Sequence, residues 1–110
     1  MIQETLSKIE ARIRKLSSLR DENKAELLSL LARLKSEIGE LSKTHSEEAQ
    51  SITAFAEVST HEAARQQRNP ELLKLSLEGL SASVQQFETS HPRLVETVNA
   101  ISLMLSNSGV

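Results

Sequence analysis

The chain of 110 residues contains no cysteine, tryptophan or tyrosine, and Phe55 and Phe87 are its only phenylalanines. The absence of cysteine excludes disulfides, thiolate catalysis and cysteine-bound zinc. Large aromatic side chains usually anchor compact interfaces and stack on nucleic-acid bases. Their scarcity weighs against both uses, and we predict no nucleic-acid partner.

Glycine and proline are also scarce, with three and two residues respectively. Three glycines leave no phosphate-cradling loop, and the many serines lie in no strand-to-helix elbow. No segment approaches the roughly 20 continuous apolar residues of a membrane span. The N-terminus is amphipathic and unlike a signal peptide. We therefore expect a cytoplasmic protein that is not an enzyme, with no catalytic residue and no cofactor.

Charge is nearly balanced overall, with a formal net charge of -2, but it is unevenly distributed. The segment up to Lys43 holds nine basic and seven acidic residues, and the remainder is acidic. The first predicted helix is the most basic segment, through Lys8, Arg12, Arg14 and Lys15. Glu4 and Glu10 interrupt it at spacings that suit i,i+4 pairs, so we favour a solvated face over a lipid or nucleic-acid patch.

What the chain does have is a set of aliphatic stripes in steps of three and four residues. Their members are Leu6, Ile9, Ile13 and Leu16; then Leu27, Leu31, Leu34, Ile38 and Leu41; then Leu73, Leu77, Leu80, Val84 and Phe87. That spacing places each set on one face of an α-helix, which must be buried against other helices. The pattern predicts an all-α fold.

The breaks between stripes predict the connections. The first stripe loses phase after Leu16, which favours helices over 2–16 and 21–43 joined as an N-terminal hairpin over one continuous helix with a stutter. Ser18 and Asp21 are candidate N-caps, and Leu19 could staple onto the second helix.

A third helix is predicted from about 46 to 68, with Thr44 or Ser46 as its N-cap, unless it continues the second helix. Its stripe is built of small residues: Ala49, Ile52, Ala56, Ser59 and Ala63, with Phe55 and Val58 beside it. Small side chains bury little area, so this helix is the least strongly specified.

Two prolines mark the C-terminal helix pair, which spans 70–110. Asn69 is a good N-cap before Pro70, and a helix should run from there to about residue 89. Ser90, His91 and Pro92 form a predicted structural corner, from which the last helix starts at Pro92. Gly109 and Val110 would close it as a Schellman ending, with Val110 against Leu105.

The second helix carries more leucine than one seam needs, which indicates contact with more than one neighbour. We predict that its arc is an interaction surface made of Leu27, Leu28, Leu30, Leu31, Leu34, Ile38 and Leu41. A second copy of the chain would cover it, giving a homodimer or another homo-oligomer. A partner helix from another protein is the alternative occupant.

The C-terminal residues bear a resemblance. The run Phe87-Glu88-Thr89-Ser90-His91-Pro92, followed by Leu94, Asn99, Ile101, Leu105, Gly109 and Val110, resembles the signature of a family of short bacterial proteins of unknown function. Asp21-Glu22-Asn23 and the Leu-rich helix are similar to the N-terminal half of that family, and residues 44–69 resemble an insertion. The resemblance implies a small helical bacterial protein and brings no activity or cofactor. Val110 departs from the isoleucine expected there.

His45, His61 and His91 are the only candidates for chemistry. Glu57 and His61 lie one turn apart, but Glu88 and His91 straddle a helix break, and His45 precedes its helix. That arrangement does not repeat the Glu-x-x-His pairs of di-iron bundles, so we predict no metal site. His91 sits in a tight corner, where a ring nitrogen should bond a backbone group of the preceding helix end.

Together these features predict one domain over 1–110, an antiparallel bundle of four or five helices. Its role should be protein–protein interaction or self-association. A chaperone-like or adaptor bundle that binds a partner helix is the second hypothesis. Peripheral membrane binding by the basic first helix is the third, weakened because its stripe lacks Trp and Phe.

Overall fold

The structure is a computed structural model that describes residues 1–17 and 19–107. Within those ranges it holds five α-helices, one 3-10 turn and no strand, which confirms the all-α prediction. The helices are α1 (Ile2–Arg14), α2 (Asp21–Leu41), α3 (Ser46–Ala64), α4 (Pro70–Val84) and α5 (Pro92–Asn107). The turn η1 (Gln85–Phe87) continues directly from α4.

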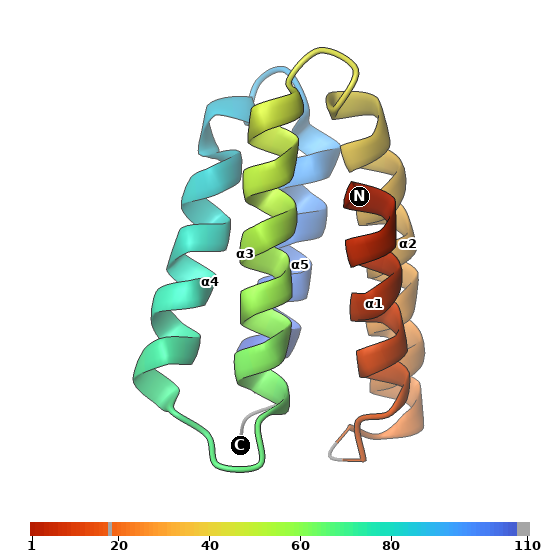
Figure 1. Cartoon of the computed structure of the whole chain (residues 1–110), viewed down its shortest axis with the longest axis vertical. Coiled ribbons are helices and arrows are strands. Elements are labelled where there is room, and N and C mark those ends of the chain that lie inside the picture. Colours follow the sequence, from red (N-terminus) through yellow and green to blue (C-terminus); the bar gives the residue numbers. More distant parts are fainter. Residues whose placement is uncertain (18, 108–110) are drawn as a thin grey trace.

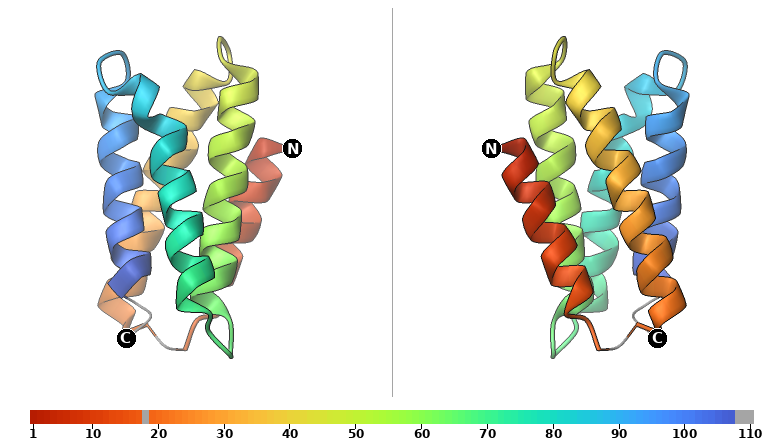
Figure 2. Two further views of the ribbon diagram at one scale, coloured as in Figure 1. Left: turned by 90° about the vertical axis from the view of Figure 1, so that its left-hand side faces the viewer. Right: turned by 90° about the vertical axis from the view of Figure 1, so that its right-hand side faces the viewer.

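Successive helices run in opposite directions along the long axis of the molecule (Figure 1). In order around the bundle, α1 contacts α2, α2 contacts α5, α5 contacts α4, α4 contacts α3, and α3 contacts α1. The five helices therefore close a ring (Figure 2). Because five is odd, one neighbouring pair has to be parallel, and that pair is α1 and α3 (Figure 1).

The helix breaks fall where the stripes change, but two predicted caps are wrong. The first break lies between Arg14 and Asp21, so the continuous helix with a stutter is excluded. Arg20 occupies the N-cap position of α2 with no side-chain cap bond, Asp21 is the first helical residue, and Ser18 lies outside the described residues. Leu19 is buried in the core.

The second break separates α2 from α3 at residues 42–45, which settles that α3 is a helix of its own. His45 holds the N-cap position in place of Thr44 or Ser46. The cap predicted for α4 is confirmed, because the Asn69 side chain accepts a hydrogen bond from the backbone N–H of Leu72 at 3.1 Å. α5 starts at Pro92 as expected, whereas the predicted ending at Gly109 and Val110 lies outside the described residues.

The core is aliphatic and is shared by all five helices. α3 contributes its small residues, with Ala49, Ile52, Ala56 and Ala63 all buried. These short side chains let neighbouring backbones come close, and α3 contacts each of the other four helices. The helix with the weakest sequence signal is therefore the one that touches all four others.

Candidate interaction site

The arc of α2 that was predicted to bind a partner lies inside the bundle. Leu27, Leu30, Leu31, Leu34, Ile38 and Leu41 are buried, and Leu28 is partly buried against the same core. The side chains of α1, α3 and α5 pack around α2 and use up its wide apolar arc. The prediction of an exposed leucine arc on α2 is therefore corrected, because these seven side chains pack within the chain's own bundle.

Apart from Met1 and Leu103, the large exposed apolar side chains of the described residues lie on α3 and α4. Phe55 and Val58 on α3 are 39% and 46% exposed, and Leu72 and Leu75 on α4 are 42% and 54% exposed. Each pair has i,i+3 spacing, so its two members lie on one face of their helix. α3 and α4 are adjacent and antiparallel (Figure 1).

These side chains belong to longer stripes. Phe55 and Val58 were noted in the sequence beside the small-residue stripe of α3, but the stripe at Leu72 and Leu75 was not predicted. On α3 the stripe is Ser51, Ala54, Phe55 and Val58, and on α4 it is Leu72, Leu75, Gly79 and Ala82. Both have helical spacing, and these eight positions hold no charged residue, whereas the next α3 positions at that spacing are Glu48 and Glu62. We call this surface, defined by those eight residues, the α3–α4 face. Its α4 stripe runs one position out of step with the core stripe that starts at Leu73.

The α3–α4 face has a protruding Phe55 ring with a hollow beside it. The Phe55 ring lies against Gly79 of α4, at a point where a Cβ atom would overlap the ring. Beyond the ring is a hollow of about 410 Å³ lined by Ser51, Gly79, Ala82 and other residues of the two helices. Any side chain at position 79 would therefore displace the Phe55 ring from this place.

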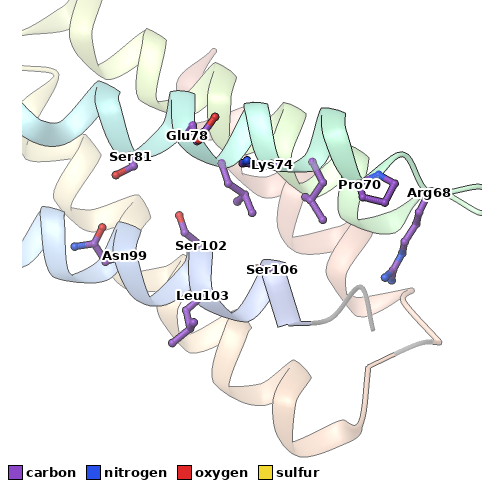
Figure 3. Close-up of a pocket in the computed structure, with 11 residues that line it drawn as sticks. Arg68, Pro70, Lys74, Glu78, Ser81, Asn99, Ser102, Leu103 and Ser106 are labelled. Carbon is purple, nitrogen blue, oxygen red and sulfur yellow. The ribbon is translucent and has the colours of Figure 1, made fainter.

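A second hollow separates α4 from α5 (Figure 3). We call this hollow, of about 650 Å³, the α4–α5 groove. Leu73 and Leu77 line it from α4, while α5 contributes the shorter side chains Ser102, Ser106 and Asn99. The Ser102 hydroxyl is buried and has no hydrogen-bond partner among the described residues.

His45 and His91 meet at one end of the bundle, 46 positions apart in the sequence. Both rings stand edge to face on Phe87, with centroid separations of 5.4 Å and 5.5 Å, and their own centroids are 6.4 Å apart. The Nδ1 atom of His45 is 2.8 Å from the Thr44 hydroxyl, and that of His91 is 3.0 Å from the Ser90 hydroxyl. The cluster joins the α2–α3 connection to the α4–α5 connection.

The α2–α3 and α4–α5 connections also contain the same type of backbone hydrogen bond. The N–H of His45 donates to the carbonyl of Leu41, and the N–H of His91 donates to the carbonyl of Phe87, both at 2.8 Å. The corner at His91 therefore differs in detail from the prediction, because its ring nitrogen contacts a neighbouring hydroxyl while the backbone makes the bond to the helix end. The geometry indicates packing and hydrogen bonding at these rings.

Other predicted candidates are more dispersed. His61 is exposed on α3, beside a shallow hollow that Arg12 and Arg65 also line. In the described part of the chain, no three His, Cys, Asp or Glu side chains are grouped so that they could hold a metal ion. No helix in residues 1–17 or 19–107 is long and apolar enough to cross a membrane.

The basic residues of α1 are mostly in solvent. Lys8, Arg14 and Lys15 are exposed, as expected for a solvated face. One ion pair connects this helix to its neighbour, between Lys35 of α2 and Glu10 at 3.6 Å, and Lys35 also donates to the Ser7 hydroxyl at 3.1 Å. These contacts tie α1 to α2 within the N-terminal hairpin.

One comparison with known proteins gives a match. The profile of a family described as a domain of unknown function, DUF4404, matches residues 27–110, about three quarters of the chain. No curated protein and no solved structure gives a significant match. The match includes residues 44–69 and omits α1, so the proposed insertion and the N-terminal similarity stay predictions.

Proposed function

The chain belongs to the DUF4404 family, and we propose that it acts without catalysis, by pairing with a second copy of itself through the α3–α4 face. The observation that carries this proposal is the exposure of Phe55, Val58, Leu72 and Leu75 on two adjacent helices. Exposed apolar side chains gathered on neighbouring helices often mark a site where another molecule binds. Covering it would remove aliphatic and aromatic area from water, the main favourable contribution to protein association.

The shape of the face supports a second copy as the occupant. Leu72 and Leu75 protrude at one end of the α4 stripe, and the hollow beside Gly79 and Ala82 lies at the other end. A two-fold axis between these leucines and the hollow would place Leu72 and Leu75 of each copy in the hollow of the other. Such an isologous contact is self-complementary and closes as a dimer.

The absence of charge from the two stripes also favours this pairing. In a two-fold contact the residues next to the axis lie near their own counterparts, so like charges there would repel one another. The described stripes present aliphatic, hydroxyl and phenyl groups only. Charged side chains such as Glu47 and Glu48 line the outer end of the hollow, where an interface rim is usually polar.

Sedimentation velocity over a micromolar concentration series tests the proposal. We expect the wild type to shift from monomer to dimer, and the double variant Leu72→Gln/Leu75→Gln to remain monomeric at the same concentrations. Glutamine has nearly the helix propensity of leucine, so α4 should stay folded. Leu103→Gln on α5 is the matched control, because Leu103 is 64% exposed and lies outside the α3–α4 face. It should dimerise like the wild type.

Two results would contradict this function. A wild type that stays monomeric throughout the series removes the dimer, and equal dimerisation of the double variant moves the contact to another surface. The adaptor hypothesis would place a helix of another protein on the same face, and a monomer stabilised by such a helix would favour it. Flotation with anionic liposomes, lost on charge reversal at Lys8 and Arg14, would favour peripheral membrane binding by α1.

A further inference from the structure

We propose that the α4–α5 groove binds the aliphatic chain of an amphiphile whose anionic head group lies at the end formed by Arg68, Pro70 and Lys74. The groove lies on a different side of α4 from the α3–α4 face (Figure 3). Ligand binding in the groove is therefore a separate property from self-association. Each property can fail while the other holds.

The groove exists because α5 presents short side chains where α4 presents long ones. Ser102 and Ser106 of α5 line the same hollow as Leu73 and Leu77 of α4, and hydroxymethyl groups are too short to fill the space between two helices. The resulting volume of about 650 Å³ lies within the range of small-molecule sites. Its size and open side suit a flexible chain that lies along the seam between the helices.

The lining specifies an aliphatic ligand over an aromatic one. Neither Phe55 nor Phe87 lines the groove, so a planar ring would find no aromatic partner to stack on. Leu73 and Leu77 offer methyl groups from the α4 side, and Leu103 flanks the opening from α5. Methylene groups gain free energy against such a surface through area burial alone, with no special geometry.

Charge at the two parts of the groove specifies how the ligand is oriented. Arg68 and Lys74 line the end where α4 begins, and a helix N-terminus adds a partial positive charge there. Lys74 forms no ion pair with a described side chain, whereas Glu78 lines the groove one turn further along α4. A carboxylate or phosphate is thus attracted to the first end and repelled from the second.

The length of the groove suits an alkyl chain. The α4 lining extends from Pro70 to Ser81, which corresponds to a rise of about 16 Å along the helix axis. A single alkyl chain fits within the space, and the polar groups of Ser102 and Asn99 lie along its side.

Displacement of a fluorescent fatty acid such as cis-parinaric acid tests this inference. The chain contains no tryptophan or tyrosine, so protein emission does not obscure the probe. With every competitor below its critical micelle concentration, we expect dodecanoate and dodecyl phosphate to displace the probe more strongly than dodecanol, and dodecyltrimethylammonium least. A difference between the first two competitors would distinguish a carboxylate head group from a phosphate.

Two variants should weaken binding for different reasons. Ser102→Leu places a larger side chain in the groove and should abolish probe binding, with Ser36→Leu on the exposed face of α2 as its control. Lys74→Glu reverses charge at the head-group end and should weaken dodecanoate about tenfold while leaving dodecanol unchanged. Lys8→Glu is the charge control, because α1 and α4 do not touch.

The proposal is overturned if the wild type does not bind the probe, or if Ser102→Leu binds it as well as the wild type. It is also overturned if all four competitors displace the probe equally, because that result indicates non-specific adsorption. The double variant Leu72→Gln/Leu75→Gln should still bind the probe. Retention of probe binding by a monomeric variant would show that groove and dimer are independent.

Discussion

The second and third helices, α2 and α3, bury very different side chains. α3 buries less apolar side chain than α2, yet it is α3 that has large apolar residues exposed to water. The six buried residues of α2 are all leucine or isoleucine. Those of α3 include alanines, hydroxyl residues and Glu62, whose carboxylate pairs with Arg65 at 2.8 Å. Yet α2 has no large exposed apolar side chain, whereas α3 exposes Phe55 and Val58.

The difference comes from where each helix sits in the ring. α3 contacts all four other helices, and apart from Ile52 and Glu62 the side chains that it buries there are small. Phe55 lies at the flank of the helix, where it packs across Gly79 and stays partly in water. The position of an apolar surplus thus depends on how many neighbours a helix has, and not only on how many leucines it carries.

The largest effect should come from removing a leucine of α2. Leu34 is fully buried, so Leu34→Ala should lower the free energy of unfolding by about 2–5 kcal/mol, through lost burial and the cavity left behind. Urea unfolding followed by circular dichroism measures it. Leu103→Ala, at a site that is 64% exposed and outside the α3–α4 face, is the control and should cost far less. A loss below about 1 kcal/mol for Leu34→Ala would contradict the central packing of α2.

The next effect should come from enlarging a small residue of α3. Ala56 is 2% exposed, and Ala56→Leu would force a longer side chain between close helices at a cost of about 1–3 kcal/mol. Ala54→Leu, on the exposed side of the same helix, is the matched control. Because Ala54 belongs to the α3–α4 face, unfolding is measured well below the dimer dissociation constant, where this substitution should be nearly neutral. If both substitutions are equally tolerated in thermal unfolding, α3 is not held by close approach.

A smaller effect of opposite sign is expected at Ser59. Its hydroxyl is fully buried without a hydrogen-bond partner among the described residues, so Ser59→Ala should raise the free energy of unfolding by about 1 kcal/mol. Ser36→Ala on the exposed face of α2 is the control, because it changes only the helix propensity and should add about 0.5 kcal/mol. A loss of stability in Ser59→Ala would mean that the hydroxyl is satisfied and its removal harmful.

The helices and their breaks were predictable because their signals are local. The stripe phase after Leu16, the Asn69–Pro70 pair and Pro92 each act within one turn of chain. The caps at Arg20 and His45 were mispredicted, although Asp21 and Ser46 beside them are better N-cap residues. Intrinsic cap preference is worth about 1 kcal/mol, which the packing of two connections at a bundle end can outweigh.

The surfaces were less predictable because they depend on which helices become neighbours. The leucine arc of α2 was correctly seen as wide, but its neighbours α1, α3 and α5 belong to the same chain. The α4 stripe at Leu72 and Leu75 was visible at helical spacing, yet it ran beside a stronger core stripe and broke off at Gly79. Only the contact of Phe55 with Gly79 shows that the two stripes form one face.

The smallest change in stability, with a clear change in association, should come from Val58→Thr. Val58 is 46% exposed, and threonine keeps the β-branched shape, so the free energy of unfolding should change by no more than about 0.5 kcal/mol. The hydroxyl would have to be desolvated at a dimer contact, so the dissociation constant from sedimentation should rise several-fold. Measuring unfolding well below that constant separates the two effects. An unchanged dissociation constant would place Val58 outside the dimer contact. Phe55 would then be the large apolar residue by which α3 contacts the second copy.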